Sequence, residues 1–186
     1  MSHLKHILYL SFVFLFFQAI DNTEVGILSQ FTYQNGSSWV GPYANALLFL
    51  GSGVVAPINF YIGKYKYKYV LFFSSLAFLA YIGMEILFLK VGISTFIEIT
   101  ILIVSFLAGI VLSALYNGQF NYLNRCSQLD KEPYKYFGIN LAIAQSANIL
   151  GNVVSALLIT PLGQLTYAIV MFFVMLAICC CFLFVK

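Results

Sequence analysis

The chain has 186 residues, of which 62% are hydrophobic and only 8% are charged, and its mean hydropathy is +0.94. An ordinary soluble domain carries about 25% charged residues, so this composition excludes a soluble enzyme, a disordered chain and a nucleic-acid-binding protein. The net charge of +3 reflects the distribution of basic residues between loops. We therefore expect an integral membrane protein that contacts the lipid bilayer and has no nucleic-acid partner.

Long, continuous apolar runs predict membrane-spanning helices, each of which needs about 20 apolar residues. The short alternating segments typical of a membrane β-barrel are not found. The first apolar run, residues 7–17, is too short to cross alone, so its helix must continue past Glu24. A cleaved signal peptide would explain the same run, but no small-residue cleavage site follows it. We predict an all-α polytopic protein forming one transmembrane domain, with helices over residues 7–28, 42–62, 68–90, 97–120, 137–158 and 164–185.

Basic residues are divided unequally between the two sides of these helices. Eight of the nine Lys and Arg residues fall in the termini and in the connections on the same side, and Lys90 is the exception. Cytoplasmic loops carry the excess of Lys and Arg, so we predict that both termini are cytoplasmic. The sequon Asn35-Gly36-Ser37 then falls in the exterior loop 29–41 and makes Asn35 a possible glycosylation site. These features favour the plasma membrane or an endomembrane, and an organelle inner membrane stays open.

Polar side chains inside the predicted helices are candidate functional residues, because polar groups at membrane depth usually face a bundle interior or a water-filled cavity. Gln145, Asn148, Asn152 and Ser155 recur at helical spacing in the fifth helix and form one row. Such a row either lines a solute cavity or holds neighbouring helices together by hydrogen bonds of about 0.6–2 kcal/mol. The residues that we expect to face a cavity are Gln18, Asp21, Asn22, Glu24, Asn117, Asn121, Gln145, Asn148 and Asn152.

Two of these residues, Asp21 and Glu24, are expected either to bind a cation or a proton or to lie near the exterior interface within reach of water. We expect Glu85 near a helix end, paired with Lys90 or reaching outward, and His3 in a flexible N-terminus. The sequence contains no phosphate-binding loop, nucleophile elbow or zinc-ligand spacing. We accordingly expect no enzyme activity, no catalytic residue, no cofactor and no metal site.

The stretch from residue 113 to 159 resembles the uncoordinated-93 family, a divergent branch of the major facilitator superfamily. The resemblance rests on a Gly-Gln and a Tyr-Leu at the end of the fourth helix, and on a Gln-Ser and a Gly-Asn in the fifth. The basic turn at residues 57–72 resembles the signature loop of the superfamily, although Phe60 replaces the acid that normally precedes the glycine. The residues that match these motifs are Gly63, Gly118, Gln119, Tyr122, Gly151 and Asn152.

The resemblance implies a facilitator fold whose N-terminal half is a pair of three-helix inverted repeats. Family members with assigned roles are regulators of potassium channels or trafficking chaperones of membrane receptors, so it also implies a regulatory or scaffold subunit. A full member has twelve helices, and we expect this chain to correspond to the N-terminal half. One half alone would expose its polar rows to lipid, which predicts another membrane protein or a second copy as partner. Alternatives are a half-size transporter of a small solute and an accessory structural subunit of a large membrane assembly.

Overall fold

The structure is a computed structural model that describes residues 3–55, 57, 66–92 and 94–185. Its elements are α1 (Leu4–Gln34), α2 (Val40–Val55), α3 (Tyr67–Val91), α4 (Thr95–Asp130), α5 (Pro133–Leu162), α6 (Gln164–Cys181) and the short 3₁₀ helix η2 (Phe182–Phe184). Five of these helices, all except α2, are long and apolar enough to cross a membrane. The prediction of an all-α, multi-pass membrane protein is therefore confirmed for the described residues.

The helix ends differ from the prediction because polar residues extend several helices beyond their apolar runs. The loop expected over residues 121–136 reduces to Lys131 and Glu132, since α4 continues to Asp130 and α5 starts at Pro133. Lys131 ends α4 in the left-handed conformation, with φ 56°, and proline is favoured in the first turn of the next helix because its φ is already helical. Similarly, α1 continues to Gln34 through half of the predicted 29–41 loop.

The remaining boundaries also shift. The second helix, predicted over residues 42–62, is helical from Val40 to Val55, and most of the rest of that range lies outside the described residues. The fourth begins two residues earlier than predicted, at Thr95, because the Ser94 side chain caps it by accepting a hydrogen bond from the Ile97 amide. The last helix keeps its predicted start at Gln164 but gives way to η2 after Cys181.

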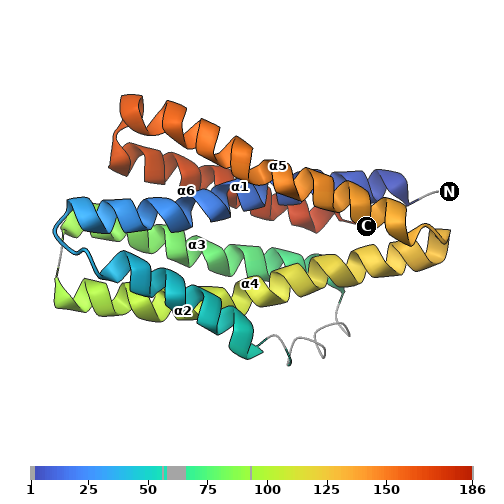
Figure 1. The fold of residues 1–186 in the computed structure, drawn as a ribbon, viewed down its shortest axis with the longest axis horizontal. Coiled ribbons are helices and arrows are strands. Elements are labelled where there is room, and N and C mark those ends of the chain that lie inside the picture. The colour runs from blue at the N-terminus through green and yellow to red at the C-terminus, as the bar shows by residue number, and fades with distance from the viewer. Residues whose placement is uncertain (1–2, 56, 58–65, 93, 186) are drawn as a thin grey trace.

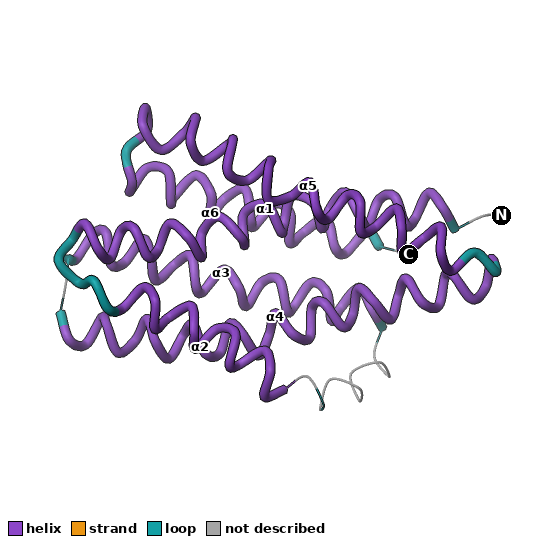
Figure 2. Tube along the Cα trace, in the orientation of Figure 1, coloured by secondary structure: helices purple, strands orange, loops and turns teal. Residues whose placement is uncertain are grey.

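The helices run roughly along one long axis and pack as a bundle (Figure 1). The main contacts pair α2 with α4, α1 with α5, and α3 with both α4 and α6. Both termini and the α4–α5 turn lie toward one end, whereas the α1–α2 and α5–α6 connections lie at the other (Figure 2). In this arrangement α1 contacts α2, α5 and α6 and also approaches α3 and α4, so its middle lies among the helices that carry most of the other polar groups.

Glycines let two helix pairs approach closely. A Cβ atom added to Gly109 of α4 would lie 1.9 Å from the Leu48 carbonyl oxygen of α2. A Cβ atom added to Gly151 of α5 would lie 2.3 Å from the Ala19 carbonyl oxygen of α1. Small residues at such crossings are typical of membrane helices, because packing replaces the hydrophobic driving force there. The α2–α4 and α1–α5 contacts therefore depend on the absence of a side chain.

Aromatic side chains fill the core between α1, α3 and η2. The ring centroids of Phe14 and Phe182 are 5.1 Å apart, and those of Phe17 and Phe78 are 5.6 Å apart. Phe78 also stacks on Tyr81 with centroids 5.3 Å apart, so the aromatic core holds the Tyr81 ring one helical turn away from Glu85.

Candidate functional site

Three acidic side chains are buried inside the bundle. Asp21, Glu24 and Glu85 are 5%, 0% and 1% exposed. The first two lie on one face of α1, because residues three apart are neighbours on a helix. Acids inside a membrane bundle are costly and mark functional sites by default, so this group, which we call the acid cluster, is the candidate functional site.

The position expected for Glu85 is wrong. It lies on the buried face of α3 together with Phe78 and Ile82, which are also fully buried, whereas Lys90 is exposed. Residues 78, 82 and 85 follow the spacing of one helix face. Because the apolar residues of that face are buried in the core, Glu85 is buried with them. Asp21 and Glu24, for which two alternatives were open, are both buried within the bundle.

Hydrogen bonding in the acid cluster is incomplete. The Tyr116 hydroxyl of α4 donates to Oδ2 of Asp21 at 2.9 Å, but Oδ1 of Asp21 receives no hydrogen bond. Glu24 and Glu85 lie within reach of each other, and Glu24 also lies within reach of the Tyr167 hydroxyl, yet none of their four carboxyl oxygens makes a hydrogen bond of good geometry. The Tyr81 hydroxyl is buried without a partner as well and interacts electrostatically with all three acids.

Tyr167 connects the acid cluster to α5 and α6. Its side chain is 1% exposed and interacts electrostatically with Glu24. Its hydroxyl lies 3.0 Å from Oγ of Ser155, which also donates to the Gly151 carbonyl at 2.8 Å. A cavity of about 240 Å³ adjoins these residues between α1, α5 and α6, and Thr23, Ser155 and Tyr167 are its hydroxyl-bearing lining residues. The cluster therefore draws groups from every long helix of the bundle.

A second buried polar group joins α1, α4 and α5. Asn140 is 6% exposed, and its side-chain oxygen accepts hydrogen bonds from Gln119 Nε2 at 2.9 Å and from Ser11 Oγ at 3.1 Å. Gly118, the residue before Gln119 on α4, packs against Val70 and Leu71 of α3. These bonds hold three helices together, which is a structural use of Gln119, one of the residues that match the family motif.

The polar row of α5 is split between the bundle and its surroundings. Ser155 is buried, but Gln145, Asn148 and Asn152 are exposed. Only 17% of the most apolar window of α5 is buried, compared with 39–50% for the other four long helices. The three amides therefore lie on the least covered surface of the least buried long helix.

The other predicted polar residues are distributed between these environments. Gln18 is half-buried on α1, and Asn22 is exposed there. Asn117 and Asn121 are half-buried on α4, and the Asn117 side chain donates to the Ser113 carbonyl at 2.8 Å. The structure thus brings Asp21 and Glu24 together with Glu85 but leaves the exposed amides of α5 apart from them.

The remaining motif residues have separate surroundings. Tyr122 is buried, and its ring lies 5.8 Å from that of Tyr67. Gly63 lies outside the described residues. Asn35 is exposed directly after α1, while Ser37 of the same sequon is buried and its hydroxyl donates to Glu98 at the start of α4.

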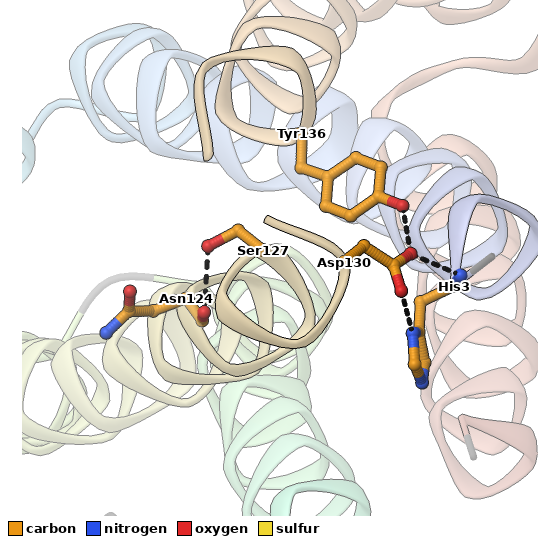
Figure 3. A network of polar contacts seen from close by, with 5 residues as sticks. All are labelled: His3, Asn124, Ser127, Asp130 and Tyr136. Carbon is orange, nitrogen blue, oxygen red and sulfur yellow. Dashed lines mark hydrogen bonds and ion pairs between the residues drawn. The ribbon is translucent and has the colours of Figure 1, made fainter. Parts of the chain in front are cut away.

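The N-terminus is held in place, in contrast to the expectation of flexibility. The backbone amide of His3 donates to Oδ2 of Asp130 at 2.7 Å, and its Nδ1 lies 2.8 Å from Oδ1. Figure 3 shows that the Tyr136 hydroxyl points at the same carboxylate, to which it also donates. Sequence spacing could not reveal this contact, because His3 and Asp130 are 127 residues apart.

Comparison of the chain with protein-family models, curated proteins and solved structures finds no match. In the described part of the chain, no three His, Cys, Asp or Glu side chains are arranged to hold a metal ion.

The tyrosines around the acids were not predicted, because nothing distinguishes Tyr81, Tyr116 and Tyr167 from the apolar runs that contain them. The four-residue spacing from Tyr81 to Glu85 was the available signal, since it places both side chains on one helix face.

Proposed function

We propose that the chain is a regulatory or scaffold subunit of a channel, receptor or other membrane complex, and that it transports no solute itself. The observation that carries this proposal is the exposed amide row of α5, formed by Gln145, Asn148 and Asn152. In lipid an amide finds no hydrogen-bonding partner, so its exposure is costly. A helix of another membrane protein that offers polar groups would satisfy the row, and interhelical amide bonds are a common means of association in membranes.

The pairing of the helices supports a facilitator-type fold like that of the uncoordinated-93 family. If α1–α3 and α4–α6 were repeats, α1 would correspond to α4 and α2 to α5. The α2–α4 contact would then correspond to the α5–α1 contact, and these are the two most extensive contacts in the bundle. Gly51 of α2 lies against the α4 backbone as Gly151 of α5 lies against the α1 backbone. In that fold, the amide row would face a second six-helix unit.

The distribution of charge supports cytoplasmic termini. Exposed Lys131 and Lys135 lie around the α4–α5 turn, at the end of the bundle where both termini are found. Asn35 would then lie on the exterior side, where its exposure allows glycosylation. We propose that the chain resides in the plasma membrane or an endomembrane.

The acid cluster favours a second candidate function, a half-size transporter of a small solute that works as a homodimer or with a second half. Buried acids occur along ion and substrate pathways of transporters. Saturable solute uptake into liposomes that contain only this chain would establish transport and overturn the regulatory proposal. We expect no such uptake.

The regulatory proposal is tested by native mass in mild detergent after purification from the chain's own membrane. The wild type should run as a complex with a different membrane protein. In the variant Q145L/N148L/N152L, three interhelical bonds of about 0.6 kcal/mol or more are lost, so the affinity should fall about 20-fold or more and the lone chain should appear.

The matched control is Gln128→Leu, which removes an exposed amide at the end of α4 and should leave the complex intact. A wild type that runs as a lone chain contradicts the proposal. A complex that survives the triple substitution shows that α5 is not the contact.

A further inference from the structure

We propose that Glu24 and Glu85 share one proton and form a proton-binding site between α1 and α3. This inference goes beyond the regulatory function and does not depend on a partner at α5.

The first argument is the hydrogen bonding of the two side chains. An ionised carboxylate can only accept hydrogen bonds, whereas a protonated carboxyl group also donates one. The carboxyl oxygens of Glu24 and Glu85 are buried and make no hydrogen bond of good geometry, although the two carboxyl groups lie within reach of each other and Glu24 lies within reach of Tyr167. One proton on either residue turns that residue into a donor to its neighbour. A single proton thus satisfies groups that are otherwise unsatisfied on both helices.

The second argument is charge. Two adjacent carboxylates repel, and the repulsion grows as the local dielectric constant falls. Among the described residues, the titratable groups that interact with the pair are Tyr81 of α3 and Tyr167 of α6. Asp21 lies near Glu24 on α1 and accepts a hydrogen bond from Tyr116 of α4, and α5 contributes only the Ser155 hydroxyl beside Tyr167. None of these groups is a cation, and the buried residues of the described chain include no Lys, Arg or His. The pair can therefore lower its charge by holding a proton.

Tyr81 provides an independent indication. Its side chain is 2% exposed, its hydroxyl has no hydrogen-bonding partner, and it interacts electrostatically with Glu85, Asp21 and Glu24. The stacked ring of Phe78 fixes its position. A buried hydroxyl without a partner is costly, and here it adjoins the acids, where a proton would be taken up and released.

Loss of the proton to solvent would leave two negative charges between α1 and α3. The backbones of these two helices approach each other at few points, and the contact between the Phe17 and Phe78 rings opposes their separation. We expect high pH to loosen this contact.

The test uses the full chain in lipid nanodiscs, with glutamate labelled by ¹³C at its side-chain carboxyl carbon. The label separates Glu from Asp21 in the infrared spectrum. At neutral pH the wild type should show one protonated Glu carboxyl group per chain, and its band should disappear reversibly as the pH rises. The band should be absent in E24Q/E85Q, whose two amides can still hydrogen-bond to each other, and unchanged in the control Glu98→Gln.

Two results would overturn the proposal: no protonated Glu band in the wild type at neutral pH, or a band that persists in E24Q/E85Q. If the double variant fails to fold, the reversible pH titration of the wild type decides alone. The midpoint of thermal unfolding provides a second measurement. It should fall with rising pH in the wild type, because two charges become buried, and should depend less on pH in E24Q/E85Q.

Discussion

Replacement of Gly109 by Ala tests the close contact between α2 and α4. The new Cβ would lie 1.9 Å from the Leu48 carbonyl oxygen and 2.8 Å from the carbonyl carbon. Ordinary contact begins at 3.4 Å, so α2 and α4 must separate locally by about 1.5 Å. Both obstructing atoms belong to the backbone, and no rotamer change relieves the clash. Overpacking of this kind costs about 1–3 kcal/mol.

The matched control is Gly53→Ala on α2, where the added Cβ meets no atom within 4 Å. Both substitutions gain the same helix propensity, about 1 kcal/mol, so the difference between the variants isolates the clash. Thermal unfolding in mild detergent, followed by far-ultraviolet circular dichroism, should show a melting temperature for G109A at least about 2 °C below that of G53A. Equal melting temperatures, or a higher one for G109A, would refute the close approach of α2 to α4.

Three further predictions each concern a single polar residue. Asn140→Leu removes the acceptor of Gln119 and should lower the free energy of unfolding by about 1–3 kcal/mol. If this substitution lowers the free energy of unfolding no more than Leu in place of an exposed amide does, the buried network is contradicted. Asp130→Asn should speed hydrogen exchange of the His3 amide without altering the rest of α1, whereas unchanged exchange would show that this carboxylate does not hold the N-terminus. When the chain is expressed in a secretory-pathway host, glycosidase treatment should increase the gel mobility of the wild type and not of Asn35→Gln. If the mobility of the wild type does not change, the support for an exterior α1–α2 connection is removed.

Apolar runs predicted the fold class because lipid imposes both the length and the composition of a spanning helix. Helix ends were harder to predict. Residues 121–130 are mostly polar and were assigned to a loop, yet nothing in them breaks a helix until Lys131. Outside the membrane-spanning segments, hydropathy no longer predicts whether a residue is helical. Only the backbone preferences of the residues do so there.

The candidate site was predicted in part. Asp21 and Glu24 stood out as acids in an apolar run, and the structure buries both. Glu85 was misplaced because its distance along the chain from Lys90 suggested a local pair, whereas its helix face decided its position. Which face of a helix meets which neighbour is a tertiary property. The pairing of α3 with α1 at this point could not be read from either segment alone.

The same reasoning applies to α5. Its row of amides was evident from spacing, but one row can face inward or outward, and the structure divides it: Ser155 lies inside, and Gln145, Asn148 and Asn152 lie outside. This division is the basis for proposing a partner, because an amide left to lipid has no hydrogen-bonding partner.

Photo-crosslinking from position 148 in the chain's own membrane tests the proposed partner most directly. A photoreactive side chain in place of Asn148 should give a product that joins this chain to a different membrane protein, and the same group in place of exposed Phe73 on α3 should not. A product of twice the mass of the chain would favour the homodimeric transporter. Crosslinks to lipid alone would contradict a protein partner at α5.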